Sequence, residues 1–219
     1  MDSVIRVLLV DDDPLVRSAL ALMLGGQRDI DVVGEAPNGQ VGLDLVTELD
    51  PDVVLMDIRM PVMDGLEATV ALHQRPSPPS VVVLTTFDAD DHVVRAVAAG
   101  ADGFLLKDTP PGDIVQAIRT VAAGDAMLSP SATRSIVSRL RSSASTDRST
   151  TAAERLTVLT ERELEVAVCV GRGLSNSEIA SELYLSIPTV KSHVSRLLTK
   201  LDSNNRVQVA MVVHDAGLV

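Results

Sequence analysis

The stretch DVVLMDIRMPVMDG, residues 52–65, joins an apolar, strand-like run to an aspartate and a sharp turn. The run Val53–Met56 is continuously apolar, which is typical of a parallel strand that is covered on both faces. It ends at Asp57, and Pro61 follows within the turn. One interpretation is that Asp57 merely begins this turn. The other is that it belongs to a functional site, because α/β folds place their chemistry at the carboxyl ends of parallel strands.

The first 125 residues repeat this pattern, with apolar runs alternating with amphipathic helical segments. Such an alternation predicts an α/β doubly wound domain built on a five-stranded parallel sheet. Helix-start signals support the phasing, since Asp13 precedes Pro14 and Asp64 is followed by Glu67 three positions later. We expect strands at residues 6–10, 31–35, 52–56, 80–85 and 103–106, and helices at about 14–25, 39–49, 64–74, 89–99 and 111–123.

Charge is distributed unevenly along the chain of 219 residues, whose formal net charge is −11. Residues 1–125 contain 21 acidic and 8 basic residues, a net charge of −13. Residues 126–219 contain the remaining 9 acidic and 11 basic residues, a net charge of +2. This asymmetry indicates two modules with different partners. The acidic total therefore does not exclude nucleic acid as a partner of the second module.

The composition favours a cytoplasmic protein without a membrane partner. No apolar run reaches the roughly 18 residues that a membrane-spanning helix needs, and residues 1–10 lead too quickly into three aspartates to form a signal peptide. The single cysteine, Cys169, excludes an internal disulfide and suits a reducing compartment. The aromatic residues Phe87, Phe104 and Tyr184 are too few for a surface on which bases or sugars stack.

The region between the two modules is rich in small polar residues. After a short helical pattern at about 130–141, the segment SSASTDRSTT at residues 142–151 has seven Ser or Thr in ten positions, which predicts a flexible linker. Four short helices are expected after it, and two of them begin at capping boxes, TERE at 160–163 and SNSE at 175–178. We therefore divide the chain into a domain at residues 1–125, a linker helix and flexible linker at 126–155, and a small all-α, four-helix domain at 156–219.

Charged and polar residues follow the expected strands at one edge of the sheet. They are Asp11, Asp12 and Asp13 after the first strand, Asp57 after the third, Thr85 at the end of the fourth and Lys107 after the fifth. Carboxylates at close range repel one another unless a cation neutralises them, and a set of oxygen ligands favours Mg²⁺. A carboxylate beside such a metal can attack phosphorus, with the lysine and the threonine binding the phosphoryl oxygens. The edge thus predicts magnesium-dependent phosphoryl chemistry.

Four motifs, LLVDDD, LMDIRMPVMDG, VVVLTTF and GFLLKD, resemble in order and spacing the receiver domain of bacterial two-component response regulators. The resemblance covers residues 4–123 and implies a flavodoxin-like fold. It also implies that Asp57 is the phospho-acceptor and that Asp11 and Asp12 form the acidic pair. Mg²⁺ would be bound by Asp12, Asp57 and the backbone carbonyl of Arg59, with Asp11 acting mainly through water.

The same resemblance implies roles for the other residues of the edge. Lys107 would contact the phosphoryl group, and Thr85 and Phe104 would form a pair that changes position on phosphorylation. Phe104 also fits an ordinary core position, since it lacks the hydroxyl group of the Tyr that is commoner in the family. Asp13 and Asp64 are interpreted as helix caps.

The segment SIPTVKSHVSRLLTKLD at residues 186–202 has one apolar face at helical spacing, formed by Val190, Val194, Leu197, Leu198 and Leu201. Most of its polar residues lie away from that face, and they include Lys191, Ser192, Ser195, Arg196 and Thr199. A helix with a buried back and a front of Lys, Ser and Arg suits the major groove of DNA. The same front also fits an ordinary solvated surface.

Residues 156–219 as a whole resemble a LuxR-type helix-turn-helix domain. The resemblance implies a scaffold helix at 175–184 and a recognition helix at 187–201. It implies base-edge contacts from Lys191, Ser192 and Ser195, and phosphate contacts from Thr189, His193, Arg196 and Lys200. His193 is not expected to bind a metal, because no ligand stands at a suitable spacing.

Two features of the last segment concern the end of the recognition helix and the dimer. Asp202 stands where the family often has Gly, and it brings a negative charge to the end of the helix. In this family the final helix commonly supplies the dimer contact. Residues that fit this role are Val207, Val209, Ala210 and Val213.

The two resemblances together identify a response regulator of the NarL/FixJ family. They imply a DNA-binding transcription regulator, not an enzyme, that a sensor histidine kinase phosphorylates on Asp57 with Mg²⁺. The active form would bind double-stranded promoter DNA as a homodimer.

The main alternative is a DNA-binding regulator whose receiver is controlled by a ligand or partner, independently of phosphorylation. A third hypothesis uses both domains only for protein interactions. The acidic pair and the Lys191–Arg196 helix argue against these two hypotheses. The spacing of Asp11 and Asp13 also superficially resembles phosphatases of the haloacid dehalogenase type, but Pro14 and Leu15 do not fit that motif.

Overall fold

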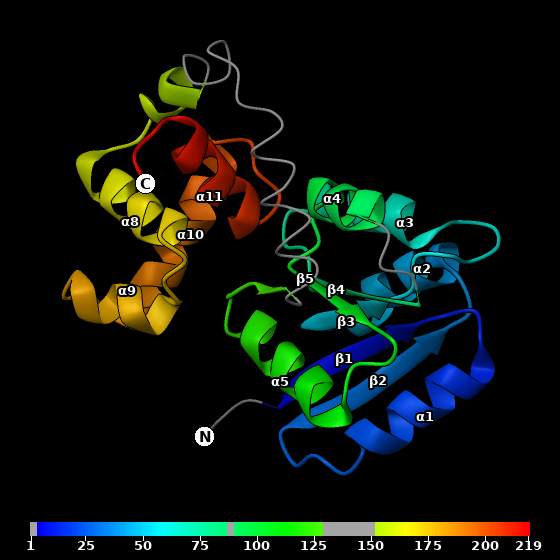
Figure 1. Cartoon of the computed structure of the whole chain (residues 1–219). Coiled ribbons are helices and arrows are strands. Elements are labelled where there is room, and N and C mark those ends of the chain that lie inside the picture. Colours follow the sequence, from blue (N-terminus) through cyan, green and yellow to red (C-terminus); the bar gives the residue numbers. More distant parts are fainter. Residues whose placement is uncertain (1–3, 87–89, 129–151) are drawn as a thin grey trace. The chain divides into compact units, whose positions relative to one another are not determined.

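The computed structural model describes residues 4–86, 90–128 and 152–219, and these residues divide into two compact units (Figure 1). One unit contains residues 4–123 and 127–128, and the other contains residues 124–126 and 152–219. The helix expected at 130–141 and the flexible linker expected at 142–151 lie outside the described residues, as does Phe87.

The first unit is a parallel sheet with the strand order β2-β1-β3-β4-β5-β6. Its strands are β1 (Ile5–Val10), β2 (Ile30–Ala36), β3 (Val53–Met56), β4 (Ser80–Thr85), β5 (Gly103–Leu106) and β6 (Met127–Leu128). Its helices are α1 (Pro14–Leu24), α2 (Gly39–Leu49), α3 (Gly65–His73), α4 (Asp90–Ala99) and α5 (Pro111–Ala122). The doubly wound fold and its five expected strands are therefore confirmed.

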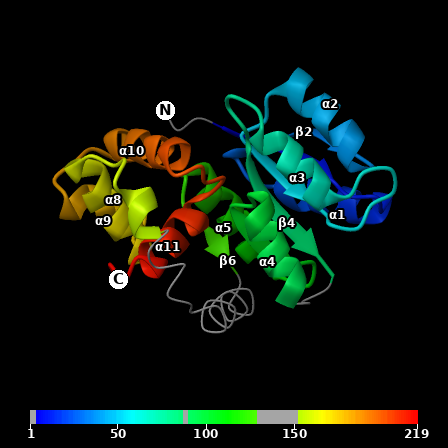
Figure 2. The ribbon, with the colours of Figure 1, turned by 90° about the horizontal axis from the view of Figure 1, so that it is seen from above.

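Alternating side chains along the strands build a core on each face of the sheet. On one face, Val7, Leu9, Leu55 and other strand residues pack with residues of α1 and α5. The residues between them, such as Leu8 and Val54, are equally buried on the opposite face. There α2, α3 and α4 lie side by side (Figure 2). Burial on both faces explains why each strand reads as a continuous apolar run.

β6 is a sixth strand, which the sequence did not predict. Met127 pairs with Gly103, and Leu128 pairs with Phe104. The N–H of Met127 also donates a hydrogen bond to the carbonyl of Asp102, at 3.1 Å. Two residues are too few to show a strand period, so this pairing depends on the position of β5 and not on a local pattern. β6 lies within the segment that was expected to be linker.

The second unit is helical, with α8 (Glu161–Gly171), α9 (Asn176–Glu182), α10 (Ile187–Lys200) and α11 (Arg206–Asp215) packed around one apolar core. Residues 152–156 add a helical turn whose Ala152 and Leu156 belong to the same core. Thr160 and Ser175 form the expected capping boxes, and Ser186 caps α10. The four expected helices are confirmed.

The dimer contact expected on the last helix is wrong for two of its four residues. Val209 and Val213 are 1% and 0% exposed and belong to the core of their own unit. They pack against other helices of the same chain, so they cannot supply a surface. Val207 and Ala210 are half-buried, and they remain compatible with an interface.

Candidate functional site

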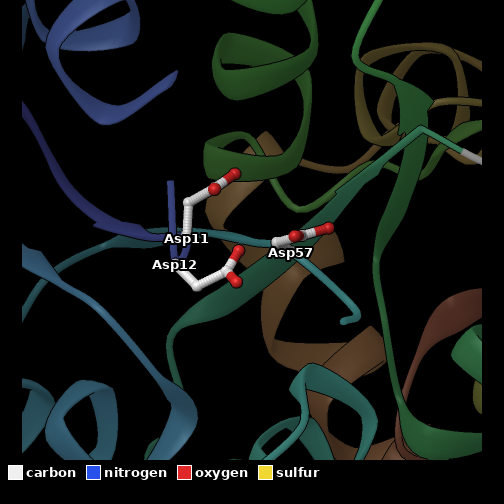
Figure 3. Close-up of side chains that lie close together, drawn as sticks. All are labelled: Asp11, Asp12 and Asp57. Atoms are coloured by element: carbon white, nitrogen blue, oxygen red, sulfur yellow. The ribbon is translucent and has the colours of Figure 1, made fainter. Parts of the chain in front are cut away.

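Three aspartates meet at the carboxyl edge of the sheet. Asp11 and Asp12 follow β1, and Asp57 follows β3, which is the neighbouring strand. The N–H of Asp57 donates to the carbonyl of Val10 at 2.8 Å, and the N–H of Asp11 donates to that of Ala36 at 3.1 Å, so the strand pairing fixes both backbones. One carboxylate oxygen from each aspartate lies within 4.8 Å of the others. Figure 3 shows Asp11 and Asp12 leaving β1 in different directions, with Asp57 beside them.

Lys107 lies between two of these carboxylates. Its Nζ is 2.6 Å from Oδ2 of Asp11 and 3.1 Å from Oδ2 of Asp57. Both aspartates are buried, whereas Asp12 is exposed. The backbone N–H of Lys107 donates to the carbonyl of Thr85 at 2.8 Å, which ties the residue after β5 to the end of β4. The four strands that end here therefore bring one ammonium group and three carboxylates together.

The electrostatics of this cluster leave it short of positive charge. Burial raises the pKa of Asp57 above its ordinary value, against the opposing effect of Lys107, and the charge of Asp11 raises it further. Burial alone would lower the pKa of Lys107, but the hydrogen bonds to Asp11 and Asp57 outweigh it, and this pKa is raised. Three carboxylates and one ammonium group carry a negative excess, which a hard divalent cation would remove. The oxygen donor set fits Mg²⁺.

The two residues expected to switch are both buried. Thr85 is 1% exposed, at the end of β4 between the strands that carry Asp57 and Phe104. Phe104 is completely buried in β5. Because Leu105 packs into the core under α1 and α5, Phe104 points to the opposite face, the side of α2, α3 and α4. Phe104 is therefore a core aromatic residue on the second strand from the one that carries Asp57.

Arg59 lies two residues after Asp57, in the loop after β3. It is exposed, and with Asp12, Asp64, His92 and Arg95 among other residues it lines an open pocket of about 500 Å³. The pocket adjoins the acidic cluster through Asp12. This edge of the sheet is therefore open to solvent beside Asp12.

Gly65 is a position of the site that residue spacing alone did not reveal. A Cβ atom at Gly65 would lie 1.9 Å from the backbone oxygen of Asp57 and 2.9 Å from Cγ of Met56. Its N–H donates to the carbonyl of Ile58 at 2.9 Å, directly after the helix cap Asp64. Only a residue without a side chain can approach the backbone of the acceptor so closely. The Gly that ends the motif MDG was the available signal.

The second unit presents most of the predicted DNA-contacting residues on the outer side of α10. Val190, Val194 and Leu197 bury its back. Half-buried His193 has an Nδ1 atom that is buried without a hydrogen-bond partner among the described residues. The exposed residues are Thr189, Lys191, Ser192, Ser195, Arg196 and Lys200. The polar front of the helix is therefore open to a partner along its length.

Lys200 forms an ion pair inside its own unit. Its Nζ is 2.7 Å from Oε2 of Glu163, which is 4% exposed and closes the capping box of α8 with Thr160. The hydrogen bonds from Lys200 and Thr160 lower the pKa of Glu163 to about 2. Lys200 thus compensates a buried carboxylate, and its contact with a DNA phosphate stays a prediction.

Two family models match the chain. The model for the response regulator receiver domain matches residues 7–119, and the model for bacterial regulatory proteins of the luxR family matches residues 157–213. The chain is 42% identical to the transcriptional regulatory protein LiaR of Bacillus subtilis (strain 168), over 98% of this chain and 99% of LiaR. It is 37% identical to the response regulator protein VraR of Staphylococcus aureus (strain Mu3 / ATCC 700698), with the same shares covered.

Solved structures are similar as well. The response regulator ChrA of a heme-sensing two-component system is 34% identical over the whole of both chains, with a TM-score of 0.54. A two-component response regulator of the LuxR family from Aurantimonas sp. SI85-9A1 is 31% identical over 63% of this chain and 98% of that chain, with a TM-score of 0.59. The similarity to ChrA extends over both described units.

Proposed function

The chain belongs to the two-component response regulators that join a receiver domain to a LuxR-type DNA-binding domain, and we propose that magnesium-dependent phosphorylation of Asp57 controls its binding to promoter DNA. The observation that carries the proposal is the buried contact of Lys107 with both Asp11 and Asp57, beside the exposed Asp12. If Asp57 merely began a turn, it would need neither a lysine partner nor two further carboxylates beside it.

Asp57 acts as the nucleophile in this proposal. The phosphodonor is the phosphohistidine of a sensor histidine kinase: a carboxylate oxygen of Asp57 bonds to phosphorus as the bond from phosphorus to the histidine nitrogen breaks. Asp12, Asp57 and the backbone carbonyl of Arg59 would hold Mg²⁺, with Asp11 acting through water, and the ion would supply positive charge for the phosphoryl oxygens. Lys107, whose Nζ is 3.1 Å from Oδ2 of Asp57, supplies the second positive charge.

Thr85 and Phe104 carry the change to the rest of the chain. Thr85 moves to donate a hydrogen bond to the phosphoryl group, and Phe104 repacks into the space that Thr85 leaves. Support comes from their burial and from the neighbouring positions of β4 and β5. The backbone of Phe104 also pairs with Leu128 of β6, which lies within the segment 126–155. A change at Phe104 therefore acts on β6.

The second domain binds double-stranded DNA through α10. Lys191, Ser192 and Ser195 read base edges, while Thr189, His193, Arg196 and Lys200 contact phosphates. Two domains of an active homodimer occupy two half-sites, which adds avidity to each weak contact. The exposed polar front of α10 supports this part of the proposal.

We place the protein in the cytoplasm, as a regulator and not as an enzyme with an external substrate. The described residues include no helix that is long and apolar enough to cross a membrane. The single cysteine, buried in the second unit, suits a reducing compartment.

The test is DNA binding before and after phosphorylation. A duplex is first selected from random sequences by the full chain in the presence of a small acyl phosphate and Mg²⁺. We expect acyl phosphate with Mg²⁺ to increase the affinity of the parent for this duplex and to leave Asp57→Asn unchanged, as measured by fluorescence anisotropy. Equal affinity of the parent with and without the phosphodonor would instead favour a receiver that works independently of phosphorylation.

A further inference from the structure

Arg17, in the first turns of α1, contacts the backbone of Asp11, the first residue of the acidic pair. Its Nη1 donates to the carbonyl oxygen of Asp11 at 2.7 Å, and its Nε donates to Oε2 of Glu35 at 3.2 Å. The arginine side chain is 17% exposed. Neither Arg17 nor Glu35 has a role in the phosphoryl chemistry proposed above. Arg17 nevertheless contacts Asp11, the residue next to Asp12, and Glu35 contacts Arg17.

A register shift in β2 places Glu35 on the side of the sheet that α1 covers. β2 pairs in step with β1 as far as Val32 and again from Gly34 onward, so that Val33 is an inserted residue. Because of this insertion Glu35 pairs with Leu9, whose side chain belongs to the core under α1 and α5. Without it, the alternation of side chains would turn Glu35 to the opposite face. Bulges that redirect a side chain are common beside functional sites.

The hydrogen bonds around Asp11 hold it on several sides at once. Arg17 holds its carbonyl oxygen, the N–H of Asp13 donates to Oδ1 at 2.9 Å, and Lys107 lies 2.6 Å from Oδ2. The peptide group that joins Asp11 to Asp12 is planar, so fixing the carbonyl fixes the start of Asp12. Among the described residues, none donates a hydrogen bond to the Asp12 carboxylate. Its direction therefore depends on its backbone (Figure 3).

We propose that Arg17, oriented by Glu35, is a positioning residue for the metal site, because it holds the Asp11 carbonyl and so directs the Asp12 carboxylate. The inference rests on the proposed function, since it requires Asp12 to be a ligand of Mg²⁺. Groups that orient metal ligands commonly contribute about 10- to 100-fold to metal affinity. We expect Arg17 to contribute about 10-fold, the lower end of that range, because it acts on the ligand through one peptide group.

If the charge of Arg17 were its only effect, we would expect Mg²⁺ affinity to rise when Arg17 is removed. Arg17 carries a positive charge close to a cation site, and its removal by itself would strengthen the attraction for Mg²⁺. A positioning role requires weaker binding in Arg17→Ala. The sign of the change therefore separates the two effects.

The experiment measures Mg²⁺ affinity from the amide shifts of residues near Asp57 in the ¹⁵N-labelled full chain, without any phosphodonor. The chain has no tryptophan, so backbone signals are a better probe than fluorescence. We expect the dissociation constant to rise about 10-fold in Arg17→Ala. Arg17→Lys keeps the charge but lacks the planar fork that spans Asp11 and Glu35, and we expect a smaller rise.

Arg119→Ala is the matched control. Arg119 bonds to both carboxylate oxygens of Asp29 at 2.8 Å and to Gln27 at 3.1 Å, so its removal also breaks a multiple arginine contact. Asp29 directly precedes β2, at the sheet edge opposite to the acidic cluster. We expect Arg119→Ala to bind Mg²⁺ like the parent.

Each outcome decides the inference. Affinity in Arg17→Ala that equals or exceeds that of the parent overturns it, as does an equal loss in Arg119→Ala. If Arg17→Ala does not fold, Arg17→Lys carries the test, and parent-like affinity in that variant overturns the inference. A parent that binds no Mg²⁺ overturns the metal site of the proposed function itself, together with the role of Arg17.

Discussion

The acidic edge of the sheet and the outer face of α10 are the two polar surfaces on which function depends, and they are built in opposite ways. At the edge, Asp11 and Asp57 are buried and share Lys107 at 2.6 and 3.1 Å. On α10, residues such as Lys191 and Arg196 are exposed, while the apolar back of the helix is buried. Phosphoryl transfer requires charges that are in position beforehand, whereas side chains that contact phosphates and base edges must be accessible to the duplex.

The largest effect expected at the acidic edge is that of Gly65→Ala. The new Cβ would meet the backbone oxygen of Asp57 at 1.9 Å, so the loop after β3 must move. We expect the free energy of unfolding of the first unit to fall by about 3 kcal/mol and phosphorylation of Asp57 to be lost. Urea unfolding followed by circular dichroism, together with intact mass after incubation with a phosphodonor, measures both.

Gly112→Ala is the control for this substitution. No heavy atom lies within 4 Å of a Cβ at Gly112, in the first turn of α5. Alanine has the higher helix propensity, so we expect a gain of up to about 1 kcal/mol and normal phosphorylation. If the two glycine variants behave alike, the close approach of Gly65 to Asp57 does not matter for the site.

Two lysines on α10 allow DNA binding and stability to be compared directly. We expect Lys191 to contact DNA and Lys200 to stabilise the second unit. We expect Lys191→Ala to lower affinity for the selected duplex by about 1–3 kcal/mol and to change the unfolding of the second unit less than Lys200→Ala does. Lys200→Ala should destabilise that unit, because the buried carboxylate of Glu163 loses its cation. Anisotropy and urea unfolding of both variants check this division, and the reverse pattern would contradict it.

The acid dependence of the second unit isolates the Glu163 contact. Its pKa in the folded protein is about 2, below the ordinary 4.5, because of the hydrogen bonds from Lys200 and Thr160. A carboxyl group with a lowered pKa stabilises the fold above its unfolded pKa, and this stability is lost as the pH falls from 4.5 towards 2. We expect the unfolding free energy of Glu163→Gln to fall less over this range than that of the parent. Identical slopes would show that the contact contributes nothing.

An effect of opposite sign is expected at the amino edge of the sheet. Burial raises the pKa of Asp102, whose carboxylate accepts from the N–H of Val81 at 2.9 Å, to about 7. The folded state thus holds this proton more tightly, so stability is lost as the pH rises from the ordinary pKa of 3.8 towards 7. Asp102→Asn keeps the acceptor without the charge. We expect its unfolding free energy to exceed that of the parent above about pH 7, and a difference that does not change with pH would contradict this.

The acidic edge could be predicted residue by residue because strand ends in a parallel sheet share one edge. Asp11, Asp57 and Lys107 each follow a continuous apolar run, so their positions required only the strand pattern. The close approach of Gly65 could not be predicted, since it depends on the path of the loop. The same holds for β6, whose two residues have no period of their own.

The error on the last helix has a different cause. From residue 207 to residue 213, α11 is apolar at nearly every position, so no single face stands out as the core. The core assignment of Val209 and Val213 depends on where the other helices pack. On α10 the pattern is amphipathic, and its back was predicted correctly for Val190, Val194 and Leu197.

The most direct test of the central role of Asp57 is the intact mass of the full chain after incubation with a small phosphodonor. The parent and Asp57→Asn are compared with and without Mg²⁺. We expect one added phosphoryl group in the parent, only when Mg²⁺ is present, and none in Asp57→Asn. A folded parent that gains no phosphoryl group, or an Asp57→Asn variant that gains one as readily, would contradict the assignment of Asp57 as the acceptor.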